Sequence, residues 1–172
     1  DVLWSYDAAT SGEGPVEIHG FERLDNGTTM VAESGRARVV FVTDEGKIES
    51  SFALTVSKPH VHHDTRLVRS TPAWTFLVAH EADGVVREYD RTGKVVWSFD
   101  VPLFGKDPAP GHDHLAHGDQ AFSAHRLSHG ATWIATATGR ASLRVHPAAV
   151  VAGCIRPDAV AAAPFARAHT PR

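Results

Sequence analysis

The chain has 172 residues, 42% of them hydrophobic and 22% charged, with a formal net charge of −3. This length suits one ordinary domain with a sizeable core, and no apolar run approaches the roughly 18 residues of a membrane-spanning helix. The weakly acidic balance argues against nucleic acid or an anionic membrane as the main partner. A single cysteine, Cys154, excludes an intrachain disulfide framework. We expect a soluble protein of the cytoplasm or the periplasm, and because the sequence starts at Asp1 rather than Met we also expect that a leader segment was removed.

Short β-type runs, rich in Val, Trp, Phe and Tyr, follow one another along the chain and are separated by Gly, Pro and Asp. No segment with helical periodicity interrupts them, so the fold class predicted is all-β. The expected units, in chain order, are a lone closing strand (1–7), a first four-stranded unit (18–52), a second (58–100), an incomplete third with three strands (119–147) and an atypical tail (148–172).

An internal repeat indicates what these units are. G-K-I-E-S-S-F (Gly46–Phe52) recurs as G-K-V-V-W-S-F (Gly93–Phe99), an offset of 47 residues (93 minus 46). A period of about 40–50 residues is typical of β-propeller blades. W-S-Y-D (Trp4–Asp7) and W-S-F-D (Trp97–Asp100) are also nearly identical. The sequence therefore predicts a partial β-propeller of about three antiparallel blades. Unrelated β-hairpins with coincidental matches are the alternative.

The segment 148–172 breaks this pattern, because it is dominated by Ala, Arg and Pro and lacks alternation and turn residues. We interpret it as an unrelated or out-of-frame extension with no fourth strand for the third unit. An incomplete ring leaves apolar blade faces and strand edges exposed. The chain is therefore expected to form a homo-oligomer that closes the propeller, since closed rings need about four to eight blades.

The segment Y-D-R-T-G-K-V-V-W-S-F (Tyr89–Phe99) resembles the tryptophan-docking motif of PQQ-binding-like (WD40/PQQ-type repeat) β-propellers. The resemblance covers roughly residues 2–146 as an incomplete fragment. It implies structural docking roles for the motif residues Asp90, Thr92, Gly93 and Trp97. The first unit departs from the motif, since Ser50 stands where the tryptophan would be. The PQQ enzymes of this group have eight blades and adjacent cysteines, and this chain has neither, so PQQ is not the expected cofactor.

Twelve histidines are an unusually large number for this length, and several gather in the loops that lead into the expected first strands. In a propeller blade the first strand is innermost, and its lead-in loop opens on the same face as the loop between strands two and three. Imidazoles and carboxylates from three blades should therefore meet at one channel mouth. The expected metal ligands are His19, His60, His62, His63, His80, His117 and His125. The expected catalytic residues are Glu33, Asp64, Glu81 and Arg66.

Neutral imidazole and carboxylate together suit Zn, Mn or Fe ions of charge +2. A site with an open coordination position could activate water, and Arg66 could stabilise an anionic transition state. The sequence thus predicts a metal-dependent hydrolase of small-molecule esters, lactones or phosphoesters. The alternative is a non-catalytic module that binds a ligand or a protein, in which the histidines hydrogen-bond to turns.

Overall fold

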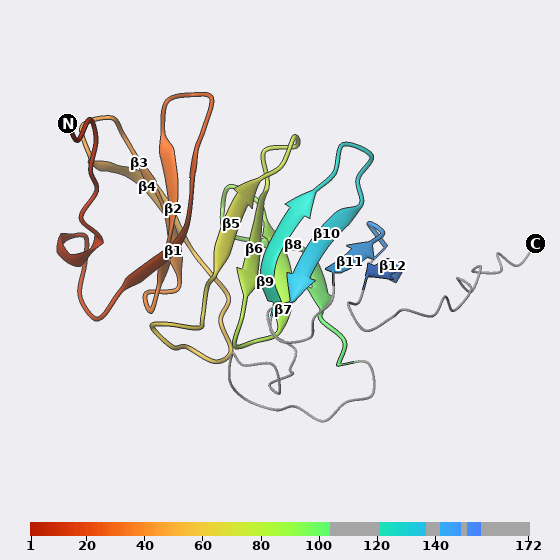
Figure 1. The fold of residues 1–172 in the computed structure, drawn as a ribbon. Coiled ribbons are helices and arrows are strands. Elements are labelled where there is room, and N and C mark those ends of the chain that lie inside the picture. Colours follow the sequence, from red (N-terminus) through yellow and green to blue (C-terminus); the bar gives the residue numbers. More distant parts are fainter. Residues whose placement is uncertain (104–120, 137–141, 149–150, 156–172) are drawn as a thin grey trace, which may run out of the picture.

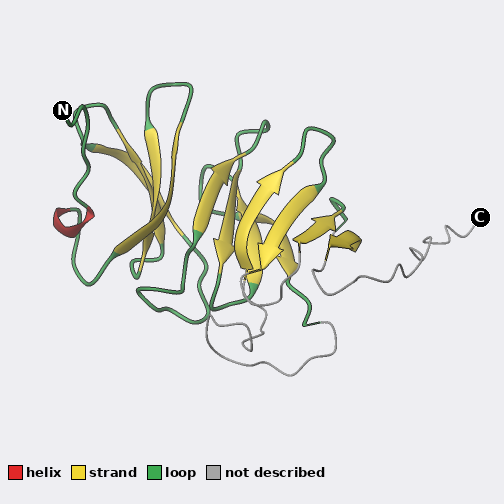
Figure 2. Ribbon diagram, viewed as in Figure 1, coloured by secondary structure: helices red, strands yellow, loops and turns green. Residues whose placement is uncertain are grey.

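The computed structural model describes residues 1–103, 121–136, 142–148 and 151–155. These residues form three four-stranded antiparallel sheets, in each of which sequential strands are hydrogen-bonded neighbours. The sheets, which we call blades one, two and three, stand in a row in chain order (Figure 1). Apart from the short 3-10 turn η1 (Ala8–Thr10), the described chain consists of strands and loops (Figure 2). The predicted all-β class and the blade architecture are confirmed.

The strands have the following bounds. Blade one holds β1 (Glu17–Arg23), β2 (Thr29–Ser34), β3 (Arg38–Val42) and β4 (Ile48–Ala53). Blade two holds β5 (Leu67–Ser70), β6 (Phe76–His80), β7 (Val85–Tyr89) and β8 (Val95–Asp100). Blade three holds β9 (Ala121–Arg126), β10 (Thr132–Thr136), β11 (Ser142–Val145) and β12 (Val151–Ile155).

Blades pack face to face through strands that are buried on both sides. All five residues of β6 are buried, and alternate side chains of a strand point to opposite faces. Phe76 and Val78 accordingly join the core shared with blade one, whereas Leu77 and Ala79 join the core shared with blade three. The middle blade therefore serves as the partner of both others.

Gly20 lies at a close approach of blades one and two. A Cβ atom there would lie 2.9 Å from Leu67 Cα and 2.9 Å from Val68 N. Only a residue without a side chain allows β1 and β5 to come this near, and this approach brings the two innermost strands together at the site described below.

Five hairpin turns among the described residues share one construction, in which a glycine donates its N–H to the carbonyl three residues earlier. These glycines are Gly27, Gly46, Gly84, Gly93 and Gly130, with φ between 66° and 88°. The β5–β6 turn has the same hydrogen bond, from Trp74 N to Thr71 O at 2.9 Å, but places Trp74 at φ 57°. The left-handed region costs a residue other than glycine about 1 kcal/mol.

The docking role that the resemblance implies for Trp97 fits the observed contacts. Trp97 lies on β8 of blade two, and its Nε1–H donates to Pro147 O of blade three at 2.9 Å. The Arg126 guanidinium lies 5.0 Å from the Trp97 ring centroid. Asp90 Oδ1 accepts hydrogen bonds from Thr92 N and Lys94 N, which fixes the turn before β8.

The prediction of a lone strand at 1–7 is wrong. Residues 1–7 form no strand, although the segment lies against blade one. Trp4 Nε1–H donates to Thr43 O at 3.1 Å, and the Tyr6 hydroxyl donates to Glu33 Oε1. Their rings pack on Val31, Val40 and Val42. The segment therefore covers an apolar blade face without adding to the sheet.

The prediction of only three strands in the third unit is also wrong. β12 pairs with β11, with Leu143 opposite Cys154 and Arg144 opposite Gly153. Part of the supposed extension thus completes blade three, and the rest of the expected tail, from residue 156, lies outside the described residues. No helix in the described ranges is long and apolar enough to cross a membrane.

Candidate functional site

The lead-in ends of β1 and β5 bring together the candidate site. β1 begins with Glu17 and carries His19, and a register shift between Ile18 and Gly20 marks a bulge at His19. Such a bulge re-aims a side chain relative to regular alternation. Across from it, the turn before β5 is closed by hydrogen bonds from His63 N and Asp64 N to His60 O. This turn directs His62 towards β1.

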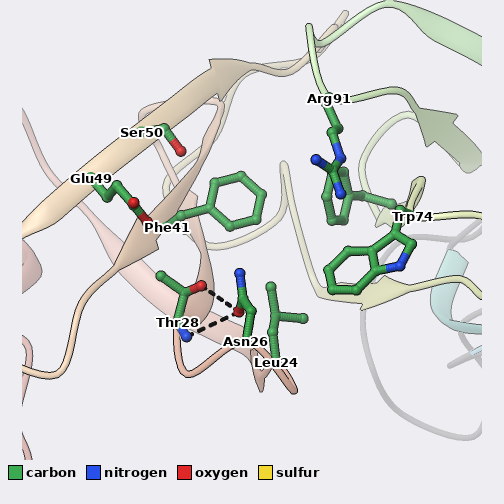
Figure 3. Close-up of a pocket in the computed structure, with 9 residues that line it drawn as sticks. Leu24, Asn26, Thr28, Phe41, Glu49, Ser50, Trp74 and Arg91 are labelled. Atoms are coloured by element: carbon green, nitrogen blue, oxygen red, sulfur yellow. Dashed lines mark hydrogen bonds between the residues drawn. The ribbon is translucent and has the colours of Figure 1, made fainter.

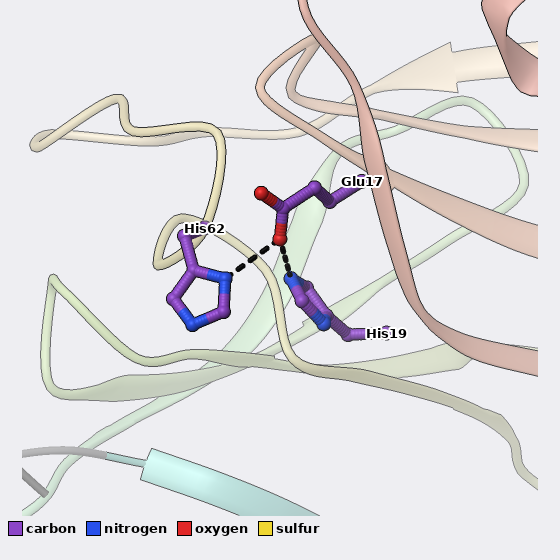
Figure 4. A group of neighbouring side chains, drawn as sticks. All are labelled: Glu17, His19 and His62. Carbon is purple, nitrogen blue, oxygen red and sulfur yellow. Dashed lines mark hydrogen bonds and ion pairs between the residues drawn. The ribbon is translucent and has the colours of Figure 1, made fainter.

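Glu17, His19 and His62 form a compact group (Figure 4). His62 Nδ1 lies 2.6 Å from Glu17 Oε2, and His19 Nε2 lies 3.1 Å from the same oxygen. One potential ligand atom from each residue lies within 4.8 Å of the other two. His19 Nε2 is buried, and its geometry towards Glu17 is not that of a hydrogen bond. A carboxylate and two imidazoles thus converge on a volume that an ion could occupy.

Arg66 contacts the far side of both imidazoles. Its Nη1 lies 3.2 Å from His19 Nδ1, and its Nη2 lies 3.2 Å from His62 Nε2. A guanidinium only donates hydrogen bonds, so both of these ring nitrogens accept. The ring protons therefore reside on His19 Nε2 and His62 Nδ1, the atoms that face Glu17. In this state His62 completes a hydrogen-bonded chain from the Arg66 cation to the Glu17 carboxylate, whereas His19, among the described residues, hydrogen-bonds only to Arg66.

Glu81 anchors Arg66 from blade two. Its carboxylate is buried and accepts a hydrogen bond from Arg66 Nε, and its Oε1 lies 3.4 Å from His63 Nδ1. The Arg66 guanidinium also lies 4.9 Å from the ring centroid of Phe122, which is 38% exposed on β9. Arg66 is therefore held between Glu81, the two histidines and an aromatic ring from blade three.

Burial lowers the pKa of His19 in this group and of His63 beside Glu81. Desolvation, followed by the nearby Arg66 charge, lowers the pKa of His19 below its usual 6.5. Desolvation also lowers the pKa of His63, against the opposing effect of Glu81. The hydrogen bond with His62 lowers the pKa of Glu17, so this carboxyl is ionised at neutral pH. Neutral imidazole and ionised carboxylate are the forms that bind metal ions.

Three of the residues expected at the site have other surroundings. Glu33 is buried and accepts hydrogen bonds from Tyr6, Ser11 and Arg38, which fasten the N-terminal segment to blade one. Asp64 accepts hydrogen bonds from Ser34 Oγ and Gly35 N, both at 2.8 Å, and so links the lead-in turn to blade one. His80 lies in the core.

Two more of the expected ligands, His125 and His60, also lie apart from the Glu17 group. His125 is exposed near the opposite end of β9, where it lines a separate hollow with Glu22 and Ser70. His60 supports the turn, since His62 N donates to its Nδ1 at 3.1 Å and its ring packs on His63 with centroids 4.6 Å apart. His117 lies outside the described residues.

Sequence reasoning missed Glu17 and Phe122. Glu17 stands two residues before His19, so the E-x-H pattern at the start of a strand was a usable signal, although the bulge at His19 sets the final direction of the imidazole. No local pattern pointed to Phe122, because its relation to Arg66 depends on how blade three packs on blade two.

Comparisons with known proteins identify the fold and no more. No protein-family model matches the chain, and no curated protein matches it. Among solved structures, a protein of unknown function from Bacteroides caccae is 17% identical with a TM-score of 0.68 over 91% of this chain and 50% of its own. Virginiamycin B lyase from Staphylococcus aureus, studied with quinupristin, is 14% identical, with a TM-score of 0.57 over 82% of this chain and 41% of its own. The WD40 β-propeller domain of Doa1 is 13% identical, with a TM-score of 0.57 over 83% of this chain and 42% of its own.

The described strands are three blades of a β-propeller. The chain spans half or less of the length of each of these structures. At this level of identity the likeness concerns the fold alone, which can carry many activities. The PQQ type of repeat stays a prediction from the docking motif.

Proposed function

We propose that Glu17, His19 and His62 bind a divalent metal ion and that the chain is a metal-dependent hydrolase of small esters, lactones or phosphoesters. The observation that carries the proposal is the convergence of these three ligand atoms from two blades within 4.8 Å of one another. Two imidazoles and one carboxylate suit Zn, Mn or Fe ions and leave coordination positions open.

The residues present fit such an ion. His19 Nε2 is a buried nitrogen without a hydrogen-bond partner, which a metal would satisfy. An ion held there would supply Lewis acidity and lower the pKa of water. Arg66, beside both imidazoles, is suited to hold an anionic group of the substrate. His63, neutral and 3.4 Å from Glu81, is suited to accept a proton.

Metal binding would rearrange Arg66. To bind a metal, His19 Nε2 or His62 Nδ1 must give up its proton. The neutral ring then carries its proton on the other nitrogen, His19 Nδ1 or His62 Nε2, which in this structure accepts a hydrogen bond from Arg66. Two donors would face each other, so the guanidinium would turn away from the imidazoles while Glu81 still holds its Nε. A second candidate function is a non-catalytic module that binds a ligand or a protein. The hydrogen bonds from Arg66 to both imidazoles favour it, because such a module would keep them unchanged.

The structural neighbours are compatible with either candidate. One is a lyase whose catalytically inactive form carries a histidine-to-alanine substitution, and another is a WD40 domain. By analogy alone, the fold supports both histidine-dependent chemistry and other roles. PQQ is not part of the proposal. We also propose self-association. Two apolar side chains on β1 support it, because Ile18 is 39% exposed and Phe21 is 63% exposed, and exposed apolar surface favours contact with another chain.

Calorimetric titration with Zn²⁺ and Mn²⁺ tests the proposal. The wild-type chain should bind about one ion, and Glu17→Gln or His62→Ala should weaken binding by at least about tenfold, equivalent to 1.4 kcal/mol. His129→Ala, an exposed turn residue, is the control and should bind as the wild type does. The rate of hydrolysis of p-nitrophenyl acetate or of p-nitrophenyl phosphate should rise with the amount of bound metal. Binding below about 0.1 ion per chain would exclude the hydrolase and leave the binding module.

A further inference from the structure

A pocket separate from the Glu17 group lies between blades one and two, and Figure 3 shows the residues that line it. It has a volume of about 160 Å³ and is formed by the β1–β2 turn, β3 and β4 of blade one and by the β5–β6 and β7–β8 turns of blade two. The β5–β6 turn is at the end of β5 opposite to His62 and Arg66 (Figure 1). The two sites are therefore separated by the length of the innermost strands.

Trp74 is the unusual feature of this pocket. It occupies the left-handed position, φ 57°, of a turn whose counterparts elsewhere in the chain carry glycine. The turn itself would be more stable with glycine, and the indole is 41% exposed, so it gains only part of the burial available to a core residue. A strained residue with an exposed aromatic ring at a pocket points to a ligand.

The apolar part of the pocket accommodates one aromatic ring. Phe41 and Phe76 form its floor, with ring centroids 5.2 Å apart and an edge-to-face arrangement. Trp74 stands across from Phe41 (Figure 3). A volume near 160 Å³ matches cavities of about 150 Å³ that bind benzene. A single six-membered ring suits a space of this volume.

The polar rim favours an anion on one side. The Arg91 guanidinium lies 5.2 Å from the Trp74 ring centroid, and no carboxylate within the described ranges pairs with it. Asn26 Oδ1 accepts from Thr28 N at 3.1 Å and from Thr28 Oγ1 at 2.6 Å, which leaves its NH₂ group as a donor towards the pocket. Glu49 lies on the β4 wall away from Arg91, so an anionic group is expected on the Arg91 side (Figure 3).

We propose that this pocket binds a small aromatic carboxylate, that is, one benzene-sized ring with a carboxylate on a short chain. The ring packs between Phe41 and Trp74, and the carboxylate accepts hydrogen bonds from Arg91 and Asn26. This site is independent of the proposed metal centre, since it shares no residue with it.

Titration calorimetry with 3-phenylpropionate and with its uncharged amide tests this site. The wild-type chain should bind the acid with a Kd of about 0.1–1 mM, as expected for a ligand of this size, and at least about tenfold more tightly than the amide. Trp74→Gly should weaken binding of the acid by about tenfold or more while its urea midpoint stays equal or rises, because glycine suits the turn. Arg91→Gln should remove the preference for the acid. Phe21→Leu, an exposed aromatic outside the pocket, is the control and should bind both probes as the wild type does.

Three results would overturn the proposal. The first is that the wild-type chain binds neither probe, and the second is that Trp74→Gly binds the acid as well as the wild type does. The third is that Trp74→Gly unfolds at a clearly lower urea concentration, which would mean that the indole is retained for packing. Equal binding of acid and amide would remove the assignment of Arg91 and the anionic class of ligand.

Discussion

The buried imidazole of His80 predicts that the chain loses stability in mild acid. His80 is fully buried, with Nδ1 3.0 Å from Asp64 O and Nε2 2.9 Å from the Tyr89 hydroxyl. Desolvation, and then the charge of Arg87, lower its pKa from 6.5 to about 4. The folded chain therefore holds this ring neutral over a pH range in which the unfolded chain protonates it.

The sign and the size of the pH effect on stability follow from this difference between the pKa of His80 in the folded and the unfolded chain. The unfolded chain binds more protons below pH 6.5, so the free energy of unfolding is greatest above pH 6.5 and falls as pH drops towards about 4. The full effect of the difference is about 3 kcal/mol. Between pH 8 and pH 5 the loss from His80 is about 2 kcal/mol. His19 and His63 also have lowered pKa values, so they add to the loss in the same direction.

Urea denaturation at pH 8 and pH 5 measures this loss. His80→Gln should lower stability at pH 8 but lose about 2 kcal/mol less than the wild type on acidification. His129→Gln, which changes an exposed ring in a turn, should keep the wild-type dependence. A titration of the His80 ring by NMR gives a second reading that does not need the variant to fold. A wild-type loss below about 0.5 kcal/mol, or a His80 pKa near 6.5, would refute the reasoning.

Two further predictions concern Arg66 and Gly20. Arg66→Gln should bind Zn²⁺ severalfold more tightly, because a unit charge roughly 7 Å from a divalent ion costs about 1 kcal/mol even in water. Arg69→Gln, whose side chain bonds backbone carbonyls, is the calorimetric control, and unchanged affinity in Arg66→Gln would contradict the account. Gly20→Ala should lower stability by about 1–3 kcal/mol, because its Cβ would collide with the backbone of β5. Gly12→Ala, whose nearest neighbour is the flexible end of Arg38, should change little in the same urea assay, and equal midpoints for both variants would show that β1 and β5 can separate freely.

The blade architecture was predictable because it repeats locally. Glycine turns recur at Gly46 and Gly93, and each precedes a strand whose penultimate residue, Phe52 or Phe99, is buried in the core. Such signals lie within a few residues of one another and need no tertiary information. The same holds for Asp90, whose hydrogen bonds are all to its own turn.

The errors arose where partners are distant in sequence or where propensity is weak. Glu33 was expected to be catalytic because it lies at the end of the second strand. Its hydrogen-bond partners Tyr6 and Ser11, however, lie 27 and 22 residues earlier in the sequence. β12 was missed because V-A-G-C-I contains Ala and Gly, which favour strands poorly, and its pairing is supplied by β11. The left-handed turn at Trp74 has no local signal, because T-P-A-W offers no glycine to mark it.

X-ray diffraction from crystals soaked in Zn²⁺, with anomalous data collected at the zinc edge, tests the central claim most directly. We predict one strong anomalous peak between Glu17, His19 and His62, with metal–ligand distances of about 2.0–2.2 Å, and an Arg66 side chain turned away from both imidazoles. A peak bound by other residues, or no peak while the Arg66 hydrogen bonds persist, would contradict the claim that this end of the blades is a metal centre.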